Sequence, residues 1–103
     1  MADSGGHPES EELTLGPILM AIADPLRRHV VAELAREPDG AERNCSSFAL
    51  PVSKATRTHH FRVLREAGLI RQIDYGNCRK SQLRRAEIET KFPGLLALIL
   101  ANA

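Results

Sequence analysis

The chain has 103 residues, which is enough for one small domain with a modest core. Aromatic residues make up 4% and Trp is absent, which argues against a stacking platform for single-stranded nucleic acid. No apolar run approaches the roughly 20 residues that a membrane-spanning helix needs, and residues 1–12 lack the basic and apolar regions of a secretory signal. Two cysteines are too few for a disulfide framework, so we expect a cytoplasmic protein with free thiols and no membrane contact.

The net charge of +1 conceals an uneven distribution. Residues 53–85 carry nine Lys and Arg against two acidic residues, a balance of +7, and the rest of the chain carries −6. A neutral chain that gathers its positive charge into one third of its length is expected to present that third to a polyanion. The alternative is a solvated, salt-bridged face, and the position of these residues in the fold must distinguish the two.

The first half of the chain predicts a tail and two helices. Residues 1–12 are rich in Gly, Ser, Glu and Pro without periodicity, which predicts a disordered tail. Residues 13–23 have apolar side chains at helical spacing. A second helix begins at Asp24-Pro25, because Asp is a good N-cap and Pro is tolerated at the first helical position. It ends at the turn residues 37–40.

Residues 41–70 predict a short helix followed by a long one. A helix over 43–49 would point Phe48 and Leu50 inward. The next helix runs from the N-cap Ser53 to about residue 67, with Gly68 as its C-terminal cap.

The last third predicts a β-hairpin and a terminal helix. Strands are expected over residues 69–74 and 79–83, joined by a turn at 75–78 and followed by a polar helical turn at 84–91. The final sequence LLALILANA is apolar nearly all round. Such a helix predicts a partner surface, and a symmetric homodimer is the simplest partner. The alternative is a helix that lies in the core of its own subunit.

In this order the elements describe a winged helix-turn-helix, a mainly α fold with a small β-hairpin. The helix that starts after Ser53 would be the recognition helix and would enter the major groove of DNA. Its outward residues must then be polar donors, a condition that Lys54, Arg57, Thr58 and His59 meet. Ser53 and Thr56 suit phosphate contacts near the helix N-terminus, and the hairpin tip would reach the minor groove or the backbone.

The sequence resembles the bacterial ArsR-type winged-helix transcriptional regulators. The resemblance rests on DPLRRHVVAELA, LPVSKATRTHHFRVLREAGLI and the basic hairpin after them, and it runs from about Leu15 to Leu83. It implies a homodimer paired through its first and last helices, which binds an inverted-repeat operator and usually represses. It also implies base contacts at Lys54, Ala55, Thr58 and His59, and hairpin contacts near Asn77, Arg79 and Lys80.

Two sets of site residues follow from the pattern and the resemblance together, within a DNA-binding domain at residues 13–91 and a dimerisation helix at 92–103. The predicted DNA-binding residues are Ser53, Lys54, Ala55, Thr56, Arg57, Thr58, His59, Arg62, Tyr75, Asn77, Arg79 and Lys80. The predicted dimer-interface residues are Leu15, Ile18, Leu19, Leu95, Leu96, Leu98 and Ile99.

The sequence departs from the family at two places. Many members sense metals through a Cys-x-Cys pair, where this chain has Asn44-Cys45-Ser46, and one thiolate cannot make a thiophilic site. We therefore expect no metal and no cofactor. Arg57 stands where the family has a buried apolar residue, and we expect its guanidinium to reach out to phosphate, since an unpaired Arg is too costly to bury.

Two other functions stay open at this stage. One is a winged-helix module that binds proteins instead of DNA, and the other is a redox-sensing regulator that uses Cys45 or Cys78. The sequence contains no Gly-rich phosphate loop, HExxH motif or nucleophile elbow, so an enzyme is not expected.

Overall fold

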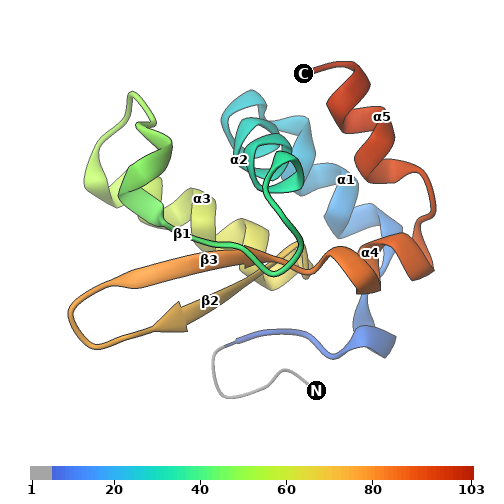
Figure 1. Cartoon of the computed structure of the whole chain (residues 1–103), viewed down its shortest axis with the longest axis horizontal. Coiled ribbons are helices and arrows are strands. Elements are labelled where there is room, and N and C mark those ends of the chain that lie inside the picture. Colours follow the sequence, from blue (N-terminus) through green and yellow to red (C-terminus); the bar gives the residue numbers. More distant parts are fainter. Residues whose placement is uncertain (1–5) are drawn as a thin grey trace.

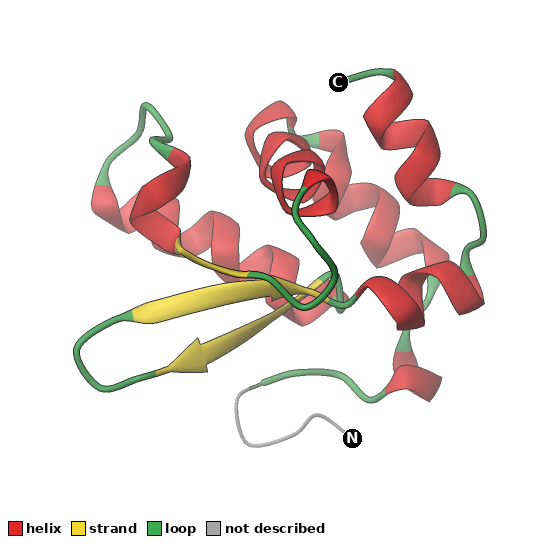
Figure 2. Cartoon of the chain, in the orientation of Figure 1, coloured by secondary structure: helices red, strands yellow, loops and turns green. Residues whose placement is uncertain are grey.

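A computed structural model describes residues 6–103 of the chain (Figure 1). A group of helices packs at one side of a three-stranded sheet, and a long hairpin of that sheet projects away from the helices (Figure 2). In chain order the elements are η1 (Ser10–Glu12), α1 (Leu15–Ala23), α2 (Pro25–Arg36), β1 (Glu42–Asn44), η2 (Cys45–Phe48), α3 (Lys54–Ala67), β2 (Ile70–Asp74), β3 (Arg79–Leu83), α4 (Arg85–Lys91) and α5 (Leu95–Ala101), where η marks a 3₁₀ turn.

The predicted helix boundaries of α2 and α3 are confirmed by their caps. The Asp24 carboxylate accepts hydrogen bonds from the backbone N–H groups of Leu26 and Arg27, at 2.8 and 3.1 Å, with Pro25 at the first helical position. At α3 the Ser53 hydroxyl accepts from the backbone N–H of Thr56 at 3.2 Å. Gly68 ends α3 with a φ of 89°, a left-handed conformation that a residue with a Cβ rarely adopts.

The hairpin is confirmed, and the sheet has a third strand that the sequence analysis missed. β2 and β3 pair antiparallel from Ile70↔Leu83 to Asp74↔Arg79. β1 pairs with the other edge of β3, in the order β1-β3-β2. The predicted helix over 43–49 is therefore wrong at its first two residues. Residues 42–44 are a strand because they satisfy backbone groups of β3 that would otherwise lie unpaired, and only Cys45–Phe48 forms a helical turn.

The core lies between α1, α2, α3 and the base of the sheet. Its largest fully buried side chains include Ile18, Leu34, Phe61 and Leu64, and Phe48 and Leu50 point inward as predicted. α5 packs against α2 and contributes Leu96 and Ile99 to the same core. Within residues 6–103 no helix is both long enough and apolar enough to cross a bilayer.

The segment before α1 differs from the predicted disordered tail. Residues 1–5 lie outside the described residues, but residues 6–12 run along the sheet and include η1 (Figure 1). His7 is buried, and its Nε2 accepts a hydrogen bond from the backbone N–H of Gln72 in β2 at 2.8 Å. Leu13 is 2% exposed and packs where Gly68 leaves space, since a Cβ on Gly68 would lie 1.9 Å from a Leu13 methyl carbon. His7 and Leu13 thus hold this segment against the rest of the chain, and the polar composition of the segment gave no indication of it.

Candidate nucleic-acid interface

α3 is amphipathic, with its polar stripe on the outside. His60, Phe61, Leu64 and Ala67 are buried against the helices, since they share one face at the i, i+3, i+4 spacing. The opposite face of the helix is open to solvent. The exposed residues on it include Lys54, Ala55, Thr56, Thr58, His59 and Arg62, and the N-cap Ser53 is also exposed.

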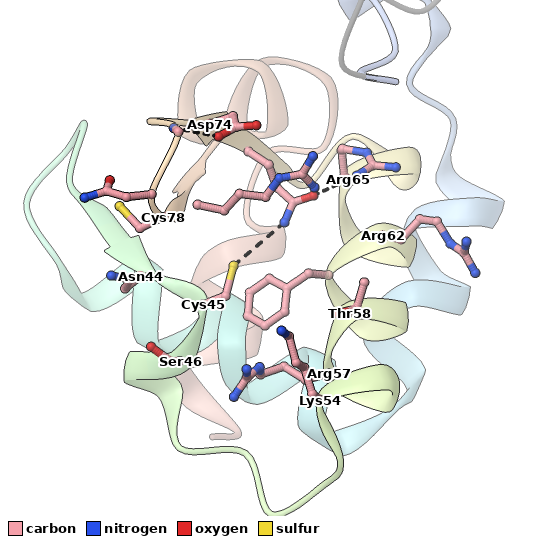
Figure 3. Close-up of a pocket in the computed structure, with 15 residues that line it drawn as sticks. Asn44, Cys45, Ser46, Lys54, Arg57, Thr58, Arg62, Arg65, Asp74 and Cys78 are labelled. Carbon is pink, nitrogen blue, oxygen red and sulfur yellow. Dashed lines mark hydrogen bonds between the residues drawn. The ribbon is translucent and has the colours of Figure 1, made fainter.

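α3 and the β2–β3 hairpin form the two walls of one groove of about 900 Å³ (Figure 3). The α3 wall supplies Lys54, Arg57, Thr58, Phe61, Arg62 and Arg65. The hairpin wall supplies Gln72, Asp74, Gly76, Asn77, Cys78 and Arg79, and the corner after β1 supplies Asn44, Cys45 and Ser46. Five cationic side chains thus face the groove against one carboxylate. That carboxylate, of Asp74, already accepts a hydrogen bond from the backbone N–H of Gly76 in the turn at 2.8 Å. The groove therefore has a positive potential along its length.

The tip of the hairpin is held in shape by its own contacts. The Tyr75 backbone N–H donates to the Cys78 carbonyl at 2.9 Å, which closes the predicted turn. The Tyr75 hydroxyl donates to the Glu42 carboxylate on β1, and this hydrogen bond raises the pKa of Tyr75. The Lys80 ammonium lies 5.5 Å from the centre of the Tyr75 ring. Tyr75 is thus held in place by these contacts although 51% of its surface is exposed, and Asn77 and Arg79 stand exposed beside the groove.

The adjacent histidines of α3 have different surroundings, as their positions on the helix predict. His59 is exposed, and its Nδ1 lies 3.4 Å from Nη2 of Arg62. His60 is buried, and its Nδ1 lies 3.2 Å from Nη1 of Arg27 in α2. Because the guanidinium can only donate, His60 accepts this hydrogen bond with an unprotonated Nδ1. His60 therefore helps to hold α3 on α2, and His59 is the histidine that an external partner can reach.

The comparisons with solved structures decide the fold. One match is an ArsR family transcriptional regulator with a TM-score of 0.64 and 24% identity, covering 89% of this chain and 94% of that chain. A second, described as a possible transcriptional regulator for arsenical resistance, has a TM-score of 0.60 and 27% identity over 87% of this chain and 98% of its own. A third, an ArsR-like transcriptional regulator from Rhodococcus sp. RHA1, has a TM-score of 0.58 and 25% identity over 80% and 76%. The chain has the winged-helix fold of the ArsR-family transcriptional regulators. No protein-family model matches the sequence, and a search of curated proteins finds no match.

In this ArsR-type fold η2 and α3 form the helix-turn-helix, and β2–β3 is the wing. Arg57 is half-buried and lines the groove beside Lys54, outside the apolar core. The sequence analysis missed several groove residues. Arg65 continues the helical stripe of Lys54, Thr58 and Arg62, which are spaced four residues apart, and it lies three residues after the last of them, so that spacing could have identified it. Gln72, Asn44 and Ser46 carried no such signal, because the fold of the sheet brings them to the groove.

Both free cysteines line the groove, and both are half-buried. The Cys45 sulfur lies 3.5 Å from the Ser81 hydroxyl oxygen and 3.8 Å from the side-chain nitrogen of Gln72. Among the described residues no three His, Cys, Asp or Glu side chains gather as a metal site would require.

The predicted dimer interface is only partly on the surface. Ile18, Leu96 and Ile99 are 0%, 4% and 5% exposed in the single chain, because they occupy the faces of α1 and α5 that pack on the core. Assigning these three to the interface was therefore wrong, and Leu95 is half-buried against the same core. The large apolar side chains that remain strongly exposed on α1 and α5 are Leu15, Leu19, Met20 and Leu98.

Proposed function

We propose that this protein is a sequence-specific regulator that binds double-stranded DNA. The observation that carries the proposal is the cationic groove between α3 and the wing, bordered by the exposed donors of α3. A solvated, salt-bridged face would pair its cations with nearby carboxylates. Of the five cations that line this groove, Arg65 lies 4.0 Å from the Glu66 carboxylate, and the other four form no ion pair with a carboxylate of the described residues, so most of the positive charge stays available to a polyanion.

The cationic groove of the protein suits the sugar-phosphate backbone of B-DNA, which separates the major groove from the minor groove. The major groove is about 12 Å wide and admits one helix, so α3 would enter it with Lys54, Thr58 and His59 toward the base edges. The wing would lie over the adjacent minor groove, with Asn77 and Arg79 foremost. The strand of phosphates between the two would then pass along the cationic groove, near Arg57 and Arg62.

We infer that the functional unit is a homodimer on an inverted-repeat operator, and that it acts as a repressor. Two copies related by a two-fold axis would place two α3 helices in successive major grooves, about one helical turn apart. The exposed side chains of Leu15, Leu19, Met20 and Leu98 supply an apolar surface for that pairing. The likeness to ArsR family transcriptional regulators supports regulation as the outcome of binding.

Salt dependence separates DNA binding from the competing function of a protein-interaction module. Binding to duplex DNA should weaken steeply with salt, since each neutralised phosphate contributes a slope of about −0.9 to log K against log [salt]. We expect an overall slope of about −4 or steeper for the dimer, measured by fluorescence anisotropy from 50 to 300 mM KCl. A module that binds partners through apolar residues would bind no duplex, or would bind it with a slope near zero, and either result would refute the proposal.

Replacement of Lys54 by Ala tests whether α3 reads sequence. We expect it to weaken binding to a selected operator about tenfold or more and binding to random duplex much less, because a base-edge contact carries roughly 1–3 kcal/mol of discrimination. The measurement is competition binding against both duplexes, with Arg36→Ala as the control. Arg36 is an exposed cation at the end of α2, outside the groove, so its variant loses the same charge. An equal loss on both duplexes would make Lys54 a phosphate contact and would contradict base reading at this position.

A further inference from the structure

The interface between the wing and α3 changes from apolar to polar along its length. Near the core the contacts are made by Phe61, Leu64 and Ile70, which are buried. Farther out, the space between α3 and the sheet is occupied by polar side chains. Ser81 is completely buried there, and it pairs across the sheet with Gln72 on β2. Since polar contacts depend on direction, the outer part of the wing must be positioned by specific hydrogen bonds.

Gln72 uses both ends of its side-chain amide to join three parts of this interface. Its oxygen accepts a hydrogen bond from Nη1 of Arg65 on α3 at 2.8 Å. Its nitrogen points to the sulfur of Cys45, 3.8 Å away, at the corner between β1 and η2. The two contacts are the dashed lines that meet at one side chain in Figure 3. Cys45 is in turn 3.5 Å from the Ser81 hydroxyl on β3.

The backbone of Gln72 is held as well. β2 is an edge strand of the sheet, so one of its sides has no neighbouring strand. At residue 72 the N–H on that strand donates to the imidazole of His7, which is buried in the segment before α1. Strand β2 is thus fixed at one residue by the recognition helix, by the helix-turn-helix corner and by the N-terminal segment.

We propose that Gln72 is a positioning residue that sets the angle of the wing relative to α3. The inference rests on the proposed function, because only DNA binding requires both elements to meet adjacent grooves at once. Binding sites work when their elements are held to within about 0.5 Å and 10–20° of the productive geometry. The wing is a two-stranded projection with its tip far from the core, so a small rotation at Gln72 moves Arg79 and Asn77 by much more than it moves Gln72 itself.

A double-mutant cycle on the full-length chain tests the proposal, with Gln72→Met as the positioning variant. Met keeps the length and neutral charge of Gln but provides neither the acceptor for Arg65 nor the donor for Cys45. In the wild-type background Arg79→Ala should lower operator affinity about fivefold, the loss of roughly one backbone contact. In the Gln72→Met background the same change should cost less than about twofold, because the displaced wing no longer uses Arg79. Lys54→Ala should keep its full cost in both backgrounds.

A merely structural role would give a different pattern. If Gln72 only stabilised the fold, Arg79→Ala would cost as much in the Gln72→Met background as in the wild type, and this additivity would overturn the inference. Gln82 is the matched control, since it lies on β3 and its amide donates to the Gly40 carbonyl at 3.0 Å, away from α3. Gln82→Met should leave the cost of Arg79→Ala unchanged.

A second variant covers the case in which Gln72→Met lowers stability too far for binding to be measured. Gln72→Glu keeps an acceptor for Arg65 and should restore the full cost of Arg79→Ala. The added negative charge weakens DNA binding by Gln72→Glu and by Gln72→Glu/Arg79→Ala alike, so the ratio of their two affinities still measures the cost of Arg79→Ala. Loss of the Arg79 effect in Gln72→Glu would also overturn the inference. A wild-type chain that binds no duplex would refute the proposed function itself. A wild-type chain that binds duplex, together with equal costs of Arg79→Ala in the wild-type and Gln72→Met backgrounds, would refute only the role of Gln72.

Discussion

Leu98→Glu is expected to convert the proposed homodimer to monomers and to lower affinity for an inverted-repeat operator by about two orders of magnitude or more. Leu98 is 62% exposed on α5, and Leu15, Leu19 and Met20 are similarly exposed on α1. A carboxylate placed among such side chains loses water without gaining a partner when two copies meet. A monomer binds one half-site only. It therefore loses the gain in affinity that comes from linking two binding sites, which is about 10²–10⁴-fold.

Because Leu98 contributes little to the core of its own chain, this variant should keep the fold. Leu96→Glu would not test the interface, since Leu96 is 4% exposed and its replacement would unfold the monomer. Sedimentation velocity gives the oligomeric state, and anisotropy on a full operator and on a single half-site gives the two affinities. Thr90→Glu adds the same charge at an exposed position of α4 and should leave both unchanged. An intact dimer in Leu98→Glu would place the subunit contact elsewhere.

The features that the sequence predicted are those that depend on neighbours in the chain. Asp24-Pro25, Ser53 and Gly68 define helix ends through hydrogen bonds and backbone angles within a few residues, so their roles could be recognised without the fold. The groove-facing stripe of α3 is equally local, because residues at i, i+3 and i+4 share a helix face. The exposed polar face of α3, which we propose binds DNA, could therefore be predicted from the sequence.

The features that it missed depend on residues far away in the chain. Strand β1 is three residues long without alternating polarity, and it exists because Arg43 lies opposite Ser81 on β3. His7 and Gln72 are 65 residues apart, and nothing in the polar N-terminal composition indicates that the His7 imidazole would accept a hydrogen bond from the backbone N–H of Gln72. α5 shows the same limit in another form. When nearly every side chain is apolar, periodicity cannot tell that Leu96 faces inward and Leu98 outward.

Glu87→Gln is expected to lower the free energy of unfolding by about 3 kcal/mol at neutral pH, near the lower end of the cost of breaking a buried ion pair. Glu87 lies on α4 and is at the centre of a cluster of long-range contacts. Its carboxylate accepts from Nε of Arg84 at 3.0 Å and from the Ser10 hydroxyl, and Nη2 of Arg71 lies 3.6 Å away. The Arg84 side chain is only 3% exposed. Gln keeps the shape of the side chain but leaves a buried guanidinium without its counter-charge.

The same cluster predicts a pH dependence with a definite sign. Hydrogen bonding to Arg84, helped by Ser10 and Arg71 and opposed by partial burial, lowers the pKa of Glu87 from 4.5 to about 2. A carboxyl whose pKa is lower in the folded state binds fewer protons there than in the unfolded chain. Its contribution to stability is therefore complete above about pH 4.5 and declines as the pH falls through about 2.

Urea unfolding of both proteins from pH 7 to pH 2.5 measures the two effects together. The difference in the free energy of unfolding between wild type and Glu87→Gln should stay constant down to about pH 5 and then decrease steadily. Protonation of Glu87 lowers the stability of the wild type toward that of the variant. Glu89→Gln, an exposed position on the same helix, should change stability by less than about 0.5 kcal/mol at any pH. A difference that did not decrease in acid would mean that Gln destabilises by altered packing. In that case the charge of Glu87 would not be what joins the N-terminal segment, β2 and α4.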